Sequence, residues 1–304
     1  MTKTIFRGTA RRLALLAGAL LLLAAPAACA ADKLYMWQVS SETAKVTMVG
    51  SIHVGKPDFF PLPEPIEQAF AAAPVLAVEV DMTDQAVIQE SMLLMAKEGM
   101  LPGEETLETR LEPEVYARLA KAADERGLPL PMFQKYKPGI VAMMLVMNEY
   151  QRQGYDPELG IDKHFLMGAR NDGKEIRQLE KVADQLHIFL DIDDRLDDVM
   201  FAEFLDQMED VDKVTAEMIA LWRSGDADGM DRFLQEQMGD DPAMAEFYRR
   251  LMDDRNVAMA DTIAGWLAGD QDIFVVVGAG HFAGARGIIA LLEAKGLVVT
   301  QGAL

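Results

Sequence analysis

The chain has 304 residues, a formal net charge of −20 and a single cysteine, Cys29. So acidic a protein is not expected to bind nucleic acid or anionic lipid surfaces. Since Cys29 lies in the leader described next, the rest of the chain has no thiol for disulfides, thiolate metal sites or cysteine catalysis.

The first thirty residues have the features of a secretory signal peptide. Basic residues precede an apolar stretch at 13–25 that is short for a membrane span, and Ala28-Cys29-Ala30 is a small-residue cleavage site. We therefore expect export to the periplasm or the cell exterior, without stable membrane insertion after cleavage. A lipoprotein signal with Cys29 lipidated is less favoured, because Pro26 stands where such signals prefer an aliphatic residue.

Removal of residues 1–30 leaves one domain-sized chain, 31–304. The leader holds four basic and no acidic residues, so the formal charge of −20 becomes −24 without it. The remaining 274 residues are enough for a single α/β domain with a sizeable core.

Apolar periodicity and turn residues predict the elements in chain order. A hairpin of Tyr35–Val39 and Lys45–Val49 opens the domain. Helices are expected after Pro63 to about Ala73, over 84–98 with Met92, Leu93 and Met95 on an apolar side, and over 113–126, 138–151 and 159–169. Strands are expected over 75–81 and 175–179.

The C-terminal half is mainly helical. Residues 182–268 form an acidic helical pattern with breaks near Gly225 and Gly239. A strand at 273–277, a helix at 283–294 and an edge strand at 297–300 follow. We therefore predict an α/β fold in which a small central β-sheet is wrapped by many helices, with a helical insertion, or lobe, at about 182–268.

One motif occurs at both ends of the chain. An apolar strand runs into Gly50-Ser51-Ile52-His53, and another runs into Gly278-Ala279-Gly280-His281. In open α/β sheets, ligands bind beyond the carboxyl ends of the strands. The repetition predicts a site assembled from both ends of the chain.

Two glutamates join these histidines at predicted strand ends, Glu79 and Glu180. A His/Glu set suits a divalent metal ion or general acid–base chemistry. Each residue also has a structural interpretation: a turn cap for His53, a helix start for His281, an ion pair with Arg177 or Arg255 for Glu79, and a helix N-terminal carboxylate for Glu180.

The glycines before His281 allow two interpretations. A dinucleotide-binding loop is excluded by context, because only about twenty residues follow, too few for a βαβ unit. The glycines more readily allow the backbone to approach a substrate oxygen, with amide groups providing an oxyanion site.

Together these residues resemble the TraB/GumN family. The similarity rests on Gly50-Ser51-Ile52-His53-Val54-Gly55, Glu79, Gly160-Ile161-Asp162, Leu179-Glu180 with Gln185, Arg255-Asn256 and Val277-Gly278-Ala279-Gly280-His281. It covers about residues 34–300 and extends to the Tiki metalloproteases, which use manganese or cobalt. A more distant similarity reaches erythromycin esterases and haem-handling ChaN-like proteins. The family fold is a central β-sheet wrapped by helices.

The resemblance implies roles for individual residues. His53, His281 and Glu79 would be metal ligands, and Glu79 could instead be the general base. Glu180 and His164 would be further catalytic candidates, with Arg255 binding a substrate carboxylate or an oxyanion. Manganese or cobalt would be the metal favoured by resemblance, with zinc as an alternative.

The favoured hypothesis is an exported, metal-dependent hydrolase, with a peptidase preferred, acting on a peptide or small-molecule substrate. A divalent ion would lower the pKa of bound water and polarise a carbonyl. The first alternative is metal-independent ester or amide hydrolysis by His and Glu, as in erythromycin esterase-like proteins. The second is a non-enzymatic periplasmic protein that sequesters a peptide or another ligand. The sequence does not indicate the oligomeric state.

Overall fold

The computed structural model describes residues 33–192, 194–208, 210–238 and 241–303. The leader expected at residues 1–30 lies outside these ranges. Within them, no helix is both long enough and apolar enough to cross a membrane.

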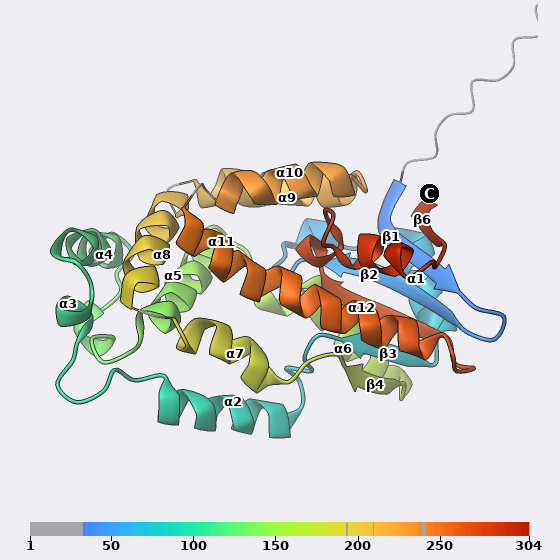
Figure 1. The fold of residues 1–304 in the computed structure, drawn as a ribbon, viewed down its shortest axis with the longest axis horizontal. Coiled ribbons are helices and arrows are strands. Elements are labelled where there is room, and N and C mark those ends of the chain that lie inside the picture. The colour runs from blue at the N-terminus through green and yellow to red at the C-terminus, as the bar shows by residue number, and fades with distance from the viewer. Residues whose placement is uncertain (1–32, 193, 209, 239–240, 304) are drawn as a thin grey trace, which may run out of the picture. The chain divides into compact units, whose positions relative to one another are not determined.

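Six strands form one mixed sheet in the order β4-β3-β5-β2-β1-β6 (Figure 1). The strands are β1 (Lys33–Ser40), β2 (Lys45–Ser51), β3 (Val75–Val78), β4 (Glu175–Gln178), β5 (Ile273–Gly278) and β6 (Val299–Ala303). β4, β3, β5 and β2 are parallel neighbours, whereas β1 is antiparallel to β2 and β6. The α/β class and the opening hairpin are confirmed.

β5 is an interior strand of the parallel part, between β3 and β2. All six of its residues are buried. Its sequence, Ile-Phe-Val-Val-Val-Gly, has no polar alternation, which is typical of a parallel strand covered on both faces.

Helices occupy most of the remaining chain. They are α1 (Glu64–Ala72), α2 (Gln85–Glu98), α3 (Leu107–Arg110), α4 (Pro113–Glu125), α5 (Pro138–Arg152), α6 (Ile161–Asp172), α7 (Val182–Leu190), α8 (Asp194–Gln207), α9 (Val211–Arg223), α10 (Ala227–Met238), α11 (Pro242–Tyr248), α12 (Asp254–Trp266) and α13 (Ile288–Ala294). A π-helical segment, η4 (Arg249–Asp253), joins α11 to α12, and a 3-10 turn, η5 (Ala279–Phe282), follows β5. α6 ends just before Gly173, whose φ of 67° is left-handed.

The apolar side chains form two main cores. One surrounds the sheet and includes residues of α1, α6, α9, α10, α12 and α13. The other lies among α3, α4, α5, α7, α8 and α11. The segment 182–268 is helical, but its helices divide between the two cores, and the helical lobe also takes in α3–α5, at the left of Figure 1.

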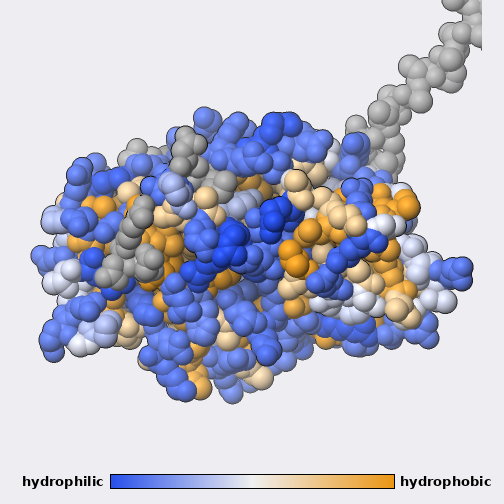
Figure 2. Space-filling model, in the orientation of Figure 1, coloured by the Kyte–Doolittle hydropathy of each residue, from blue (hydrophilic) through white to orange (hydrophobic). Residues whose placement is uncertain are grey.

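Three local expectations differ from the structure. The helix predicted from Ala283 begins at Ile288, because Gly284 adopts a left-handed φ of 76° that interrupts a helix. The last strand is shifted to 299–303. Met92 and Leu93 on α2 are 66% and 56% exposed rather than packed against another element. The face of the molecule drawn in Figure 2 carries mainly hydrophilic residues.

Candidate functional site

The parallel strands bring four predicted residues to one edge of the sheet. β2 and β5 are parallel neighbours and are followed by His53 and His281. β3 and β4 are also parallel neighbours and are followed by Glu79 and Glu180, and the backbone N–H of Glu180 donates to the carbonyl of Glu79 at 3.0 Å. Because the carboxyl ends of parallel strands lie at the same edge of a sheet, these four residues follow neighbouring strands at that edge.

Gly278, the last residue of β5, lies where these side chains meet. A methyl group on this residue would lie 3.3 Å from Oε1 of Glu79, 3.4 Å from Nε2 of His53 and 3.5 Å from Cδ2 of His281. Its φ of −49° and ψ of 136° are accessible to any residue, so glycine is not needed here for backbone freedom, and what it contributes is space next to these side chains. We call Gly278, His53, Glu79 and His281 the strand-end cluster.

Arg255 of α12 links the two buried glutamates. Its Nη2 donates to Oε2 of Glu79 at 2.6 Å and to Oε2 of Glu180 at 2.7 Å, and its Nε donates to Oε1 of Glu180 at 2.8 Å. The side-chain exposure of the three residues is only 13%, 11% and 8%. Gln185 of α7 donates to both carboxylates, at 3.1 Å and 2.9 Å. Such charge-assisted bonds hold Glu79 in one orientation.

The remaining oxygen of Glu79 faces the glycine turn. The backbone N–H of Gly278 donates to Oε1 at 2.6 Å. This amide is therefore already engaged by the protein, and the expected oxyanion site does not extend to it. Nε2 of His281 lies 3.9 Å from the same oxygen, too far for a direct hydrogen bond.

Asn256 fixes the orientation of His281. The Asn256 side chain is buried, and its Nδ2 donates to the carbonyl of Arg286 at 2.9 Å. Its Oδ1 must then accept the 2.6 Å hydrogen bond from Nδ1 of His281. A neutral His281 consequently carries its proton on Nδ1 and presents the lone pair of Nε2 to the strand-end cluster.

Asp162 plays the corresponding part for His53. Its Oδ1 lies 3.2 Å from Nδ1 of His53, and a carboxylate can only accept, so Nδ1 is the donor. Nε2 of His53 then faces Gly278. The His53 ring is 62% exposed, whereas that of His281 is 5% exposed.

These surroundings shift the two histidine pKa values in opposite directions. Burial lowers the pKa of His281 to about 4, against the opposing charge of Glu79. Partial removal from water also acts to lower the pKa of His53, but the charge and hydrogen bond of Asp162 outweigh it and raise the pKa to about 9. Burial would raise the pKa of Glu79, yet the nearby positive groups, His281 first among them, lower it to about 2. At neutral pH, His281 is neutral and His53 is charged.

Comparison with known proteins decides the family. Residues 35–301 match the model of the TraB/PrgY/gumN family. The chain belongs to this family. It is similar to the Uncharacterized protein YbaP of Escherichia coli (strain K12) and to that of Shigella flexneri, each 26% identical over 250 residues, which cover 81% of this chain and 87% of the relative. No solved structure matches the chain.

The donor atoms of this TraB/PrgY/gumN-family site suit a divalent ion by their chemistry, since imidazole nitrogen and carboxylate oxygen both bind such ions. As placed, however, the described residues contain no group of three or more His, Cys, Asp or Glu side chains able to hold one. Arg255 also keeps a permanent positive charge 2.6 Å from Oε2 of Glu79, which opposes a second cation. In this arrangement the residues do not form a metal site, and metal binding stays a prediction.

One predicted site residue of this family member, His164, is bonded to a different partner. Nε2 of His164 is 2.9 Å from Oε1 of Glu67, and its ring packs 4.9 Å from that of Phe60. No hydrogen bond or ion pair within the described ranges joins His164 to the strand-end cluster or to Arg255.

Three residues without a predicted role complete the site: Asp162, Gln185 and Asn256. All three stand in the motifs that carry the family resemblance, but their part was not assigned. The signal that could have revealed Asp162 and Asn256 is their position in the sequence beside other motif residues. Asp162 is the second residue of α6, the helix that follows Gly160, and Asn256 directly follows Arg255.

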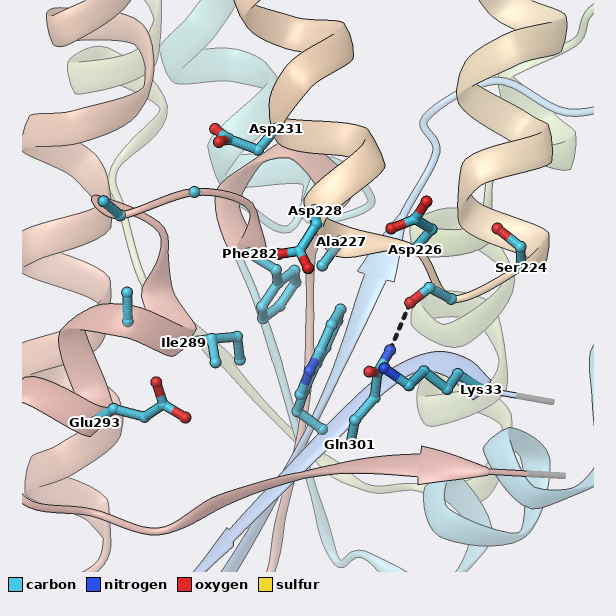
Figure 3. Close-up of a pocket in the computed structure, with 15 residues that line it drawn as sticks. Lys33, Ser224, Asp226, Ala227, Asp228, Asp231, Phe282, Ile289, Glu293 and Gln301 are labelled. Carbon is cyan, nitrogen blue, oxygen red and sulfur yellow. Dashed lines mark hydrogen bonds between the residues drawn. The ribbon is translucent and has the colours of Figure 1, made fainter. Parts of the chain in front are cut away.

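Two cavities lie near the site. One, of about 610 Å³, is lined by the carboxylates of Asp226, Asp228 and Asp231 and by Phe282 (Figure 3). It contains no residue of the strand-end cluster, although Phe282 directly follows His281. The other, of about 380 Å³, is lined by residues of α2, β4 and α7 and reaches Glu180.

Proposed function

We propose that this protein is an exported hydrolase of amide or ester bonds, with peptides as the favoured substrates, in which His281 is the general base and His53 the general acid. One observation carries the proposal: Oε1 of Glu79, Nε2 of His53 and Cδ2 of His281, the ring carbon bonded to Nε2, surround one small space beside Gly278, while both Nδ1 atoms are held by outer acceptors. That is the geometry required to move protons at a reacting carbonyl.

The residues supply the two proton transfers of hydrolysis. His281, neutral at Nε2, accepts a proton from water as the water attacks the carbonyl carbon. His53 donates a proton to the leaving nitrogen or oxygen. Glu79, held by Arg255 and Gln185, stabilises the positive charge that forms on His281.

The opposite pKa shifts of the histidines support this assignment. With pKa values of about 4 for His281 and about 9 for His53, each is in the required protonation state at pH 7. Pairs of titratable groups whose environments separate their pKa values are typical of an acid–base pair.

The preference for peptides comes from the resemblance to Tiki proteins. The cavity that reaches Glu180 is also lined by Glu90, Asp184 and Lys181. Export follows from the leader pattern alone. Cell fractionation of the full chain, beside a version lacking residues 2–30, tests it: the protein should leave the cytoplasm only with the leader.

A metal-dependent hydrolase is the second candidate. The observation in its favour is that both histidines donate Nδ1–H outward to a carbonyl or carboxylate oxygen, an arrangement that metal-binding histidines usually show. His53, His281 and Glu79 would hold manganese, cobalt or zinc, which would supply a water of lowered pKa.

The test is a screen of the purified protein against a peptide library and a panel of esters, with and without exhaustive chelation. We expect product that survives chelation and falls at least about 100-fold in His281→Gln and in His53→Gln. Activity lost on chelation and restored by manganese, cobalt or zinc would establish the second candidate instead. Tight binding of a library member without product would identify a sequestering protein and refute both.

A further inference from the structure

Ser51, the last residue of β2, has a hydroxyl group that the fold leaves unpaired. The residue is 3% exposed, and Oγ has no hydrogen-bond partner among the residues that the structure describes. Most buried polar atoms in folded proteins are paired, and an unpaired one is costly. An alanine would fill the same position without that cost.

Strand register places this hydroxyl beside the strand-end cluster. Ser51 lies opposite Gly278 in the parallel pair β2–β5. Paired residues of parallel strands point to the same face of the sheet and lie about 4.8 Å apart. The Ser51 side chain therefore leaves the sheet next to the space at Gly278 that Glu79, His53 and His281 surround.

A hydroxyl supplies what this space lacks. Oε1 of Glu79 and Nε2 of neutral His281 are acceptors, and Nε2 of charged His53 is a donor that meets no acceptor in the part of the chain that the structure describes. A hydroxyl both donates and accepts, so it can bind a water molecule while either histidine exchanges a proton.

We propose that Ser51 is a catalytic residue that holds the attacking water of the hydrolysis. This rests on the proposed function. The water oxygen forms a bond to the carbonyl carbon, its proton passes to Nε2 of His281, the bond to the leaving nitrogen or oxygen breaks, and that atom takes a proton from His53. Ser51 orients the water by hydrogen bonding and forms no covalent bond.

Three variants test the proposal. Ser51→Ala removes only the hydroxyl, so its melting temperature should equal or exceed that of the wild type, while kcat falls at least about tenfold with little change in KM. Ser51→Thr keeps the hydroxyl and should recover most of the loss. Thr47→Val is the matched control, since Thr47 is a buried hydroxyl on the same face of β2 about 13 Å away, and its turnover should be unchanged.

Crystal structures of the wild type and Ser51→Ala separate this proposal from the proposed function. We expect a water hydrogen-bonded to Ser51 Oγ and to His53, His281 or Glu79 in the wild type and no water there in the variant. Wild-type turnover in Ser51→Ala, or a wild-type structure without that water, overturns the role of Ser51. If no substrate is turned over, the proposed function fails and Ser51 falls as a catalytic residue with it, whatever the structures show of the water.

Discussion

Replacing Arg255 with methionine should strongly destabilise the fold. Arg255 makes four hydrogen bonds, three of them to the buried carboxylates of Glu79 and Glu180. Its removal leaves two buried negative charges without their partner, a change that typically costs about 3–5 kcal/mol. For a domain of this size that is a fall in melting temperature of about 6–20 °C.

The loss should depend on pH with a defined sign. The folded-state pKa of Glu79, about 2, lies below its ordinary value of 4.5. Its ionised form therefore stabilises the wild type above pH 4.5, and that contribution is lost as the pH falls toward 2. Without Arg255, one of the charges that lower this pKa is lost, so the pKa rises from about 2. The deficit of Arg255→Met should be greatest at pH 7 and should shrink as the pH falls from 4.5 toward 2.

Urea unfolding at pH 7 and pH 3 measures both effects, with Arg249→Met as the control. Arg249 also pairs with two carboxylates, Glu246 and Asp254, but these are exposed, so its loss should cost much less stability than the loss of Arg255. An Arg255→Met variant no less stable than the control, or equally destabilised at both pH values, would refute the reasoning.

Three further predictions concern the strand-end cluster. The pH profile of kcat/KM should fall off near pH 4 and near pH 9, the pKa values of His281 and His53, and a single limb near pH 6.5 would contradict the assignment. Asn256→Asp should raise the pKa of His281 by about 1–3 units in an NMR titration, because a carboxylate replaces an amide at Nδ1, and an unchanged value would remove Asn256 from the mechanism. Gly278→Ala should keep its circular dichroism but lose about 100-fold in turnover, since the methyl occupies the space between Glu79 and the histidines, and full activity would show that substrate does not use that space.

The sequence predicted the strands and the residues at their ends. Unbroken apolar runs such as Ile273–Val277 identify buried parallel strands without reference to the rest of the chain. Because such strands share one edge, His53, Glu79, Glu180 and His281 could be expected to converge before their neighbours were known.

Other parts of the site depend on contacts that no local pattern encodes. The sequence allows either Arg255 or Arg177 as the ion-pair partner of Glu79. In the structure Arg255 pairs with Glu79, whereas Arg177 pairs with Glu175, and only the tertiary fold decides between them. The tautomer of His281 depends on Asn256, whose own orientation is set by the carbonyl of Arg286. Likewise, helical periodicity predicted an apolar side for α2, but periodicity does not say whether another element covers that side.

The central position of β5 also constrains when the protein becomes functional. β5 pairs Ile273 with Val46 on one side and with Val75 on the other, so β2 and β3 have no shared neighbour until about 200 further residues have been made. Contacts between such distant residues are expected to form slowly. A nascent chain that has not yet reached β5 cannot bring His281 and His53 together, so the site can form only after that strand and His281 have been made.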